Sequence, residues 1–412
     1  MDRKLLTNFS LVFILETYNR LVGYLLILVA LKYTGSEGLG IYSFVNTLVS
    51  LLITFSGLGI NLLLTREFAR DGRNFNRMYL NVTILKLITG TIVYIIFYLI
   101  GSQHFDPVVR EILKVVWIVT IIETIAGTSF SIFYGTETVQ YIVYISLIMK
   151  TIILATAPYV LSHSGDIKLF IYTLFTLRTL QNIIITLASF RVYGLPEPKV
   201  SIRDIGGLLK ATLPFALITN VSYIFIQTDI LMLGFLTTYS DVGVYRFGFM
   251  FVEASLLISN VIVKVSYPRL SKVLYNQEDG WNFVKTLVSK TLGIATAITI
   301  SLITLADYVI PFFFENIPEG GILITKLLSI LIPAKYLDGI LSTTLYAFNK
   351  ERLVTKYITI AMFINIILNY ILITKYGYIG AGISTIISNY FLLSLYIRSL
   401  LRLKPLSEYP AR

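Results

Sequence analysis

The sequence predicts an all-α polytopic membrane protein with twelve transmembrane helices, arranged as two six-helix bundles in parallel repeat. The first observation is composition: the 412 residues are 56% apolar and 14% charged, with a mean hydropathy of +0.77, whereas a soluble domain carries about 25% charged residues. The second is a regular series of long apolar segments. The third is that basic residues gather in every other loop.

Twelve segments have the roughly 20 apolar residues that a helix needs to cross a bilayer. Between them stand residues that end helices, as in Gly35–Gly38, His104–Pro107, Gly194–Pro198 and Pro318–Gly321. The small residues of Gly377–Gly382 predict close helix packing. The predicted spans are residues 9–31, 41–65, 79–100, 113–134, 140–161, 168–190, 208–236, 241–263, 286–306, 322–346, 353–373 and 378–400.

The distribution of Lys and Arg predicts the orientation. Loops and tails on the N-terminal side of the membrane hold 22 basic residues, and those on the opposite side hold five. Because cytoplasmic loops carry the excess of basic residues, both termini are expected in the cytoplasm, in a multi-pass protein of the cell membrane. The net charge of +11 is thereby spread over six loops and tails, which excludes a nucleic-acid-binding patch.

A short internal repeat supports two similar halves. Gly40, Tyr42 and Phe44 enter the second span as Gly243, Tyr245 and Phe247 enter the eighth, at one offset of 203 residues. Since six spans separate the copies, the halves have the same orientation, as in transporters that bind substrate between two lobes. The predicted organisation is an N-terminal lobe at 1–190, a cytoplasmic linker at 191–207, a C-terminal lobe at 208–400 and a cytoplasmic tail at 401–412.

The composition also excludes several kinds of chemistry. There is no cysteine, and there are only two histidines, which excludes disulfides and thiolate sites and argues against a histidine metal site or triad. A membrane-embedded enzyme acting on lipid-linked sugars would need acidic or metal-binding residues near one face, commonly on long outer loops. The short outer loops here offer Asp106, Glu111, Asp166 and Glu315 without a metal-like cluster. We therefore expect no enzyme, no metal and no cofactor.

Twelve charged residues fall inside the predicted spans. Each costs on the order of 2.5–3.5 kcal/mol at a helix centre, so each should face a partner or a watery cavity. Seven are basic and five acidic, which leaves an excess of positive charge suited to an anion such as phosphate. The basic ones are Arg20, Lys86, Lys150, Arg178, Arg246, Lys326 and Lys335, and the acidic ones are Glu16, Glu123, Asp229, Glu253 and Asp338.

Simple pairing is the alternative explanation for these charges. Glu16 with Arg20 and Lys335 with Asp338 have helical spacing, and Asp229 and Arg246 lie at similar depth in one hairpin. Lys326 is near enough to the surface to extend to it. Lys86, Lys150 and Arg178 have no local partner in the sequence. We predict phosphate binding by Arg20, Arg246, Lys150, Arg178, Lys86 and Lys335, and H⁺ or Na⁺ coupling by Glu123, Asp229 or Glu253.

Over essentially its whole length the chain resembles polysaccharide-biosynthesis flippases, the O-antigen or Wzx-type branch of the multidrug/oligosaccharidyl-lipid/polysaccharide exporter superfamily. The segments that carry the resemblance keep the order and spacing of that family. They are Gly35–Phe44, Leu208–Phe215, Asp229–Gly234, Val242–Tyr245, Tyr267–Ser271 and Tyr376–Gly382.

The resemblance implies a V-shaped exporter that moves a polyprenyl-(pyro)phosphate-linked oligosaccharide to the outer leaflet by alternating access. It implies a monomer working with membrane lipids and with glycosyltransferase or polymerase partners. Arg20 and Arg246 match cavity arginines in related lipid-linked peptidoglycan-precursor flippases, although the two extra C-terminal helices of those proteins are absent here. The alternative is a cation-coupled multidrug antiporter of the same fold, which would have a dominant acidic site in one lobe.

Overall fold

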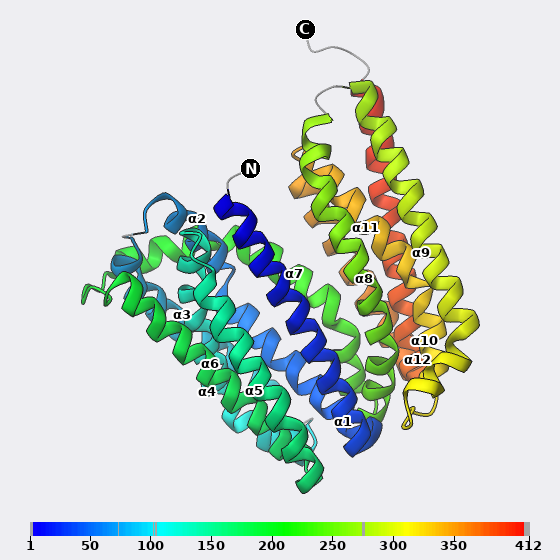
Figure 1. The fold of residues 1–412 in the computed structure, drawn as a ribbon, viewed down its shortest axis with the longest axis horizontal. Helices are drawn as coiled ribbons and strands as arrows, with labels where there is room; N and C mark the ends of the chain where they lie inside the picture. The colour runs from blue at the N-terminus through cyan, green and yellow to red at the C-terminus, as the bar shows by residue number, and fades with distance from the viewer. Residues whose placement is uncertain (1–2, 73, 102, 104, 274–276, 408–412) are drawn as a thin grey trace. The chain divides into compact units, whose positions relative to one another are not determined.

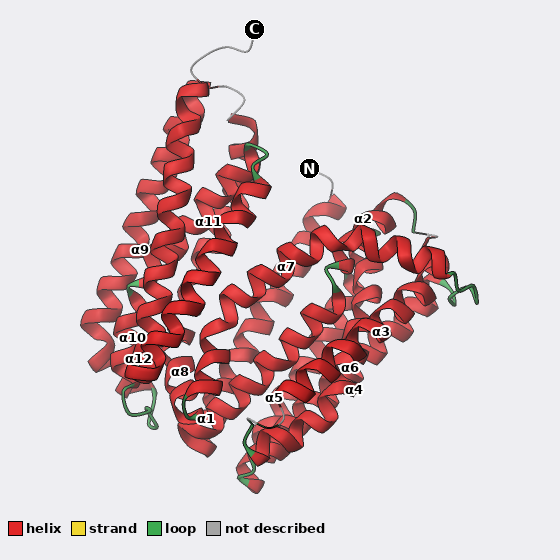
Figure 2. Cartoon of the chain, turned by 180° about the vertical axis from the view of Figure 1, so that it is seen from behind, coloured by secondary structure: helices red, strands yellow, loops and turns green. Residues whose placement is uncertain are grey.

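The computed structural model describes residues 3–72, 74–101, 103, 105–273 and 277–407. Its described residues form helices and short connections with no strand (Figure 2). The chain divides into two compact units, residues 1–223 (unit 1) and 224–412 (unit 2). The all-α, two-lobe prediction is confirmed. Residues 408–412 of the predicted tail lie outside the described residues.

Unit 1 contains six helices and most of a seventh (Figure 1). Its helices are α1 (Arg3–Gly57), α2 (Ile60–Arg70), α3 (Asn74–Gly101), α4 (Pro107–Gly135), α5 (Gln140–Ser164), α6 (Ile167–Tyr193) and the first part of α7 (Ile202–Leu236). Unit 2 contains the rest of α7, then α8 (Tyr239–Val273), α9 (Gln277–Phe313), α10 (Gly321–Ser329), α11 (Leu331–Ala347) and α12 (Glu351–Ser407).

All twelve predicted spans lie on helices, although not one to one. Nine helices in the described part of the chain are long and apolar enough to cross a membrane, so the chain is a multi-pass membrane protein. Helix α12 covers two predicted spans, with a break inside at Gly377. Helix α1 covers span 9–31 and, beyond a break at Gly35, most of span 41–65, whose last residues lie on α2. The number of crossings stays a prediction.

The breaks in α1 and α12 are built alike. Gly35 (φ 68°) and Gly377 (φ 54°) have left-handed backbone, which glycine adopts without the penalty that a Cβ atom brings. Three residues further on, a side chain at Gly38 would collide with Thr34, and one at Gly380 would collide with the backbone at Leu372. The close helix packing predicted at residues 377–382 is therefore confirmed, and the same arrangement occurs at residues 35–38.

The predicted span 322–346 is divided between α10 and α11. Pro333 has no N–H, so the carbonyl of Ser329, four residues before it, loses its helical partner. The Thr299 hydroxyl of α9 donates to that carbonyl at 3.0 Å, and the Tyr390 hydroxyl of α12 donates to the carbonyl of Ile330 at 2.9 Å. Neighbouring helices thus satisfy the backbone that the proline frees, as membrane interiors require.

Helix starts follow the sequence signals. Asp106 caps α4 by accepting from the Val108 N–H at 2.8 Å, with Pro107 in the first turn. Asp166 caps α6 in the same way through Lys168 N–H. His104, part of the predicted break before α4, lies outside the described residues.

The predicted linker 191–207 contains the end of α6 and the beginning of α7. The Ser201 N–H donates to Asn81 Oδ1 at 2.9 Å, and further along α7 the Tyr223 hydroxyl donates to the carbonyl of Thr47 at 3.1 Å. These bonds attach the first part of α7 to α1 and α3, which explains why the linker lies within unit 1 and the units divide inside α7.

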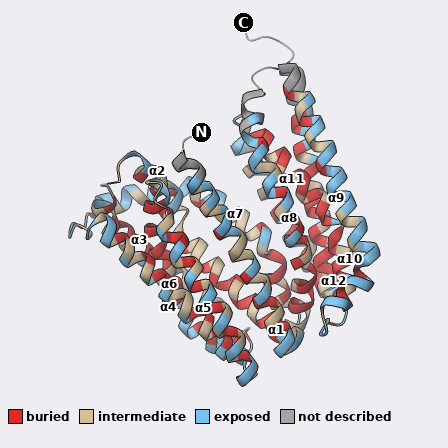
Figure 3. Ribbon diagram, viewed as in Figure 1, coloured by how far each residue is buried: buried red, intermediate tan, exposed pale blue. Residues whose placement is uncertain are grey.

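Many large apolar residues are exposed, and exposed positions recur along the helices of both units (Figure 3). On α9, Ile300, Leu305 and Val309 are 56%, 49% and 45% exposed. Exposure of this kind is expected where lipid tails, which are as apolar as leucine, are the solvent.

Candidate functional site

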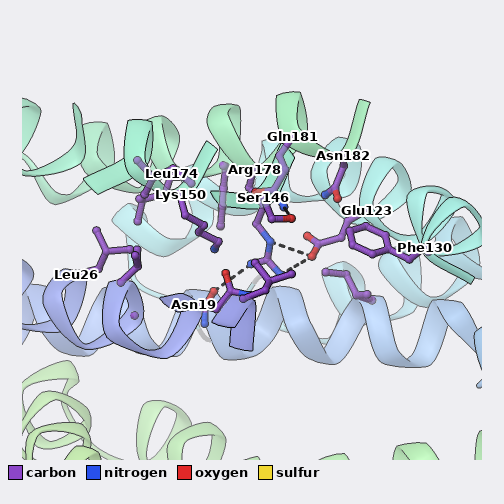
Figure 4. Close-up of a pocket in the computed structure, with 18 of the residues that line it drawn as sticks. Asn19, Leu26, Glu123, Phe130, Ser146, Lys150, Leu174, Arg178, Gln181 and Asn182 are labelled. Atoms are coloured by element: carbon purple, nitrogen blue, oxygen red, sulfur yellow. Dashed lines mark hydrogen bonds and ion pairs between the residues drawn. The ribbon is translucent and has the colours of Figure 1, made fainter. Parts of the chain in front are cut away.

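Unit 1 contains an open cavity of about 570 Å³ with both polar and apolar lining, within the size range of small-molecule sites. Side chains of α1, α4, α5 and α6 line most of it (Figure 4). The wall combines charged, amide and aromatic residues. Lys150 and Arg178, two of the predicted phosphate-binding residues, and Glu123, a predicted coupling residue, all lie on this wall.

A charge cluster lies on one side of the cavity. The Arg178 guanidinium of α6 binds Glu123 Oε1 of α4 through Nε, at 2.9 Å, and through Nη2. Its Nη1 donates weakly to Asn46 Oδ1 at 3.4 Å. Lys150 of α5 interacts electrostatically with both members of the pair but makes no hydrogen bond or ion pair within the described part of the chain. Arg178 has no local partner, as the sequence indicates, and its partner in the structure, Glu123, is 55 residues away.

Amide side chains form much of the remaining wall. The Gln181 Nε2 of α6 donates to Ser146 Oγ of α5 at 3.1 Å. Gln181 is 8% exposed, and its Oε1 has no donor among the described residues. The same holds for Asn19 Oδ1 on α1 and Glu123 Oε2. Three residues that line the cavity thus each carry a buried acceptor oxygen that no described residue satisfies.

Lys86 does not lie on the cavity wall. It is 1% exposed, and its ammonium donates to Asn61 Oδ1, the Thr124 carbonyl and Thr128 Oγ1 at 2.8–2.9 Å. Three neutral oxygens match the three N–H donors of a lysine. Lys86 is therefore placed to hold α3 against α2 and α4.

Unit 2 contains a buried acid at Asp229 of α7. It is 4% exposed. One carboxylate oxygen accepts from the Tyr245 hydroxyl at 2.7 Å and the Thr385 hydroxyl at 2.6 Å, and the other accepts from Asn369 Nδ2 at 2.8 Å and Asn365 Nδ2 at 3.4 Å. All four partners are neutral. The predicted alternative of an Asp229–Arg246 bridge is wrong, because Tyr245 and α12 surround the carboxylate.

The other predicted residues lie apart from these two regions. Arg246 forms an ion pair at 2.9 Å with Glu253, which lies seven residues further along α8. Arg20 is half-buried and makes no hydrogen bond or ion pair to a described residue. Its neighbour in sequence, Asn19, lines the cavity, but Arg20 does not. The proposed Glu16–Arg20 pair is therefore not formed.

Lys335 and Asp338 also form no ion pair in the described structure. The Lys335 ammonium lies 5.6 Å from the centre of the Phe225 ring, a cation–π distance. Lys326, expected to extend to the surface, pairs with Asp307 at 2.5 Å. Among the described residues no group of three or more His, Cys, Asp or Glu could hold a metal ion.

Sequence reasoning missed the neutral members of both regions. Asn365 and Asn369 are four residues apart on one face of α12, and Asn19, Asn46 and Gln181 interrupt apolar stretches. Amides inside spanning helices are a readable signal, because they need partners there as charges do. A search for charged residues alone does not find these amides.

This chain is similar to known proteins in sequence and in fold. The polysaccharide biosynthesis protein family matches residues 5–274. A probable low-salt glycan biosynthesis flippase of Haloferax volcanii, Agl15, is 22% identical over 173 residues, which cover 40% of this chain. The matched stretch spans about a third of that relative's length, 36%.

Two solved structures share the fold. The lipid II flippase MurJ in an inward closed conformation has a TM-score of 0.71 at 18% identity, covering 94% of this chain and 86% of that one. An inward-facing MATE multidrug resistance transporter of the MOP superfamily has a TM-score of 0.72 at 14% identity, covering 96% of both chains. With well over half of its residues matched by the family, this chain belongs to the polysaccharide biosynthesis protein family.

Proposed function

We propose that this protein is a flippase, a transporter without catalytic chemistry, that moves a polyprenyl-(pyro)phosphate-linked oligosaccharide from the cytoplasmic to the outer leaflet by alternating access. The observation that carries the proposal is the cavity of about 570 Å³ among the spanning helices of unit 1, with charged and amide residues on its wall. Polar and ionisable groups inside a membrane protein mark substrate pathways. The family match and the flippase from Haloferax volcanii support the same class of substrate.

Reconstitution of the purified full-length protein tests the proposal. Liposomes would carry a fluorescent polyprenyl-phosphate-linked hexose, and a membrane-impermeant reductant would report how much of it changes leaflet. We expect exchange only in liposomes that contain the protein. No exchange, together with uptake of tetraphenylphosphonium against a cation gradient, would replace the flippase by the multidrug antiporter.

The antiporter remains the second candidate because of Asp229. A buried carboxylate with four neutral donors and no ion pair among the described residues is the acidic site in one lobe that this alternative requires, and the MATE likeness fits it. Against it, Lys150 and Arg178 on the cavity wall of unit 1 would repel an organic cation.

For the phosphate group, the proposal keeps Arg20 of unit 1 and Arg246 of unit 2. A guanidinium offers phosphate oxygens a fixed fork and stays charged at membrane depth. Arg20→Ala or Arg246→Ala should abolish leaflet exchange at normal expression, and Arg→Lys should retain part of it. Lys335 and Lys150 are the remaining candidates without an anionic partner in the described chain, whereas Lys86 and Arg178 are engaged by protein oxygens.

Since Arg246 pairs with Glu253, its substitution needs a matched control. In the double variant Arg246→Ala with Glu253→Gln, no unpaired glutamate is left behind. If the double variant still lacks leaflet exchange, the result supports phosphate binding by Arg246. If leaflet exchange returns, the role of Arg246 is to pair with Glu253.

For energy coupling, the proposal assigns Asp229 to bind H⁺ or Na⁺. Its Oδ2 and the Ala381 carbonyl compete for the single hydroxyl hydrogen of Thr385, at 2.6 and 2.9 Å. Thr385 can therefore donate to an ionised Asp229, or donate to Ala381 while a protonated Asp229 donates to it. Both charge states fit the same packing. Glu123 and Glu253 are weaker candidates because each binds an arginine.

The proposal also includes a monomer in the cell membrane, cytoplasmic termini and glycosyltransferase or polymerase partners. Protease protection of tagged termini in sealed vesicles tests the orientation. Mass measurement of the purified protein in nanodiscs tests the oligomeric state, and cross-linking in cells tests the partners.

A further inference from the structure

The cavity of unit 1 contains groups that lack partners, and they are not of the kind that bind phosphate. Three buried oxygens on its wall, Gln181 Oε1, Asn19 Oδ1 and Glu123 Oε2, have no donor among the described residues. A buried acceptor without a partner costs free energy. The oxygens are almost fully buried as placed, so a ligand that brings hydrogen-bond donors is favoured if these side chains turn toward it.

Phosphate does not meet this requirement. An ionised phosphoester has acceptor oxygens only and would face the Glu123 carboxylate as well as the two amide oxygens. The guanidinium that could bind it is occupied, since Arg178 uses Nε and Nη2 on Glu123 and Nη1 on Asn46. Arg178 could bind phosphate only if that pair broke, and phosphate bound to Lys150 alone would leave the three acceptor oxygens without donors.

An organic cation does not fit either. It would satisfy the acceptors but would enter next to Lys150 and Arg178, both on the wall. Lys150 forms no ion pair among the described residues, and the Glu123 carboxylate near it is already paired with Arg178, so two cations face one acid on this wall. Like charges in an interior of low dielectric repel strongly.

A neutral, hydroxyl-rich ligand meets every condition. Each sugar hydroxyl both donates and accepts, so hydroxyls can donate to the oxygens of Gln181 and Asn19 and accept from the Lys150 ammonium. The rings of Tyr42 and Phe175 on the wall add apolar surface for the C–H faces of a sugar ring. We infer that this cavity is the subsite for a sugar residue of the lipid-linked glycan, separate from the site of its phosphate. The inference rests on the proposed flippase function and names the part of the substrate that unit 1 binds.

The experiment compares binding of three probes to the full-length protein in nanodiscs. They are a polyprenyl-phosphate-linked glucose, polyprenyl phosphate without sugar, and tetraphenylphosphonium. The test variant is Gln181→Met, which keeps the length of the side chain and removes the acceptor. Its matched control is Gln227→Met, a glutamine of α7 that does not line the cavity.

We expect Gln181→Met to weaken binding of the glucose lipid by about fivefold to tenfold, the loss of one hydrogen bond, and to leave polyprenyl phosphate unchanged. Gln181→Glu, which keeps acceptor oxygens, should retain binding. Asn19→Leu, on a different helix, should repeat the selective loss and serves if Gln181→Met does not fold, as judged by its melting temperature.

Three results would overturn the inference. Equal weakening of the glucose lipid and polyprenyl phosphate would make the cavity a lipid-phosphate site. Binding of tetraphenylphosphonium that depends on Gln181 would make it a cation site. If no variant changes the binding of any probe, the cavity holds water and no part of the substrate. If the wild-type protein exchanges the glucose lipid between leaflets and Gln181→Met binds it normally, the sugar subsite is rejected and the flippase function stands. If the wild-type protein does not exchange the glucose lipid, the flippase function is rejected.

Discussion

Unit 1 and unit 2 each contain a buried acidic residue, but the surroundings of the carboxyl group differ. In unit 1 the Glu123 carboxylate is held by the Arg178 guanidinium, next to a cavity of about 570 Å³. In unit 2 the Asp229 carboxylate has only neutral donors and is packed to 4% exposure. In the first arrangement an ion pair compensates the carboxylate, and a cavity beside it has space for a ligand. In the second, neutral hydrogen-bond donors surround the carboxylate, and it forms no ion pair among the described residues.

The largest effect that this comparison predicts is for Asp229→Asn. An amide is neutral and cannot exchange a positive charge with solution, so transport driven by a proton or sodium gradient should fall to the rate of passive exchange. Gradient-driven flux in proteoliposomes measures this. Asp307→Asn, which removes an acid from a partly exposed pair, should leave the gradient response intact. An unchanged response in Asp229→Asn would remove ion coupling from unit 2.

The next effect concerns the Arg178–Glu123 pair. Arg178→Met leaves a mostly buried carboxylate without its cation. Breaking a fully buried pair costs 3–5 kcal/mol, and since the two side chains here are 31% and 17% exposed, we expect about 2 kcal/mol. Thermal unfolding in detergent measures it. Adding Glu123→Gln should recover most of the loss, and failure to recover would mean that packing of Arg178, not its charge, stabilises unit 1.

A smaller effect on stability is expected at Lys86, a buried cation. Like Asp229 it is buried among neutral partners, but it is fully satisfied by three oxygens. Lys86→Met removes its hydrogen bonds and also the cost of burying the charge, so we expect a net loss of about 1 kcal/mol in stability. Leaflet exchange per folded molecule should stay at the wild-type level. A strong loss of exchange with normal stability would return Lys86 to the predicted phosphate-binding residues.

The smallest effect on stability is expected at Lys150. It lines the cavity and has no hydrogen bond or ion pair to any described residue, so Lys150→Met should change the free energy of unfolding by less than about 0.5 kcal/mol. Its consequence should appear in binding of the glucose lipid instead. Melting temperature and affinity measured on the same preparation separate the two, and a large destabilisation would contradict the placement of Lys150 at a ligand site.

The sequence predicts the spanning helices well because lipid permits little else. Long apolar stretches with satisfied backbone must be helical, and the glycines near residues 35 and 377 indicate where they turn. It also predicts which charged residues lie within helices. It does not predict their partners, since Glu123 and Arg178 are 55 residues apart, and Asp229 lies 140 residues from Asn369 and 156 from Thr385. Only the packing of helices decides those pairings. The local pairs that spacing favours, Glu16–Arg20 and Lys335–Asp338, are the ones that do not form.

The two glycine turns, at residues 35–38 and 377–380, have a practical consequence for mapping this protein in a membrane. Each reverses the chain inside a continuous helical stretch, with no extended segment between the arms. A protease needs several residues in extended conformation, and an epitope tag needs a connection that can lengthen without strain. Neither exists at these turns, so sites there will resist cleavage and reject insertions. The connection between α9 and α10, which has non-helical residues from Phe314 to Gly320, is the better position for a reporter.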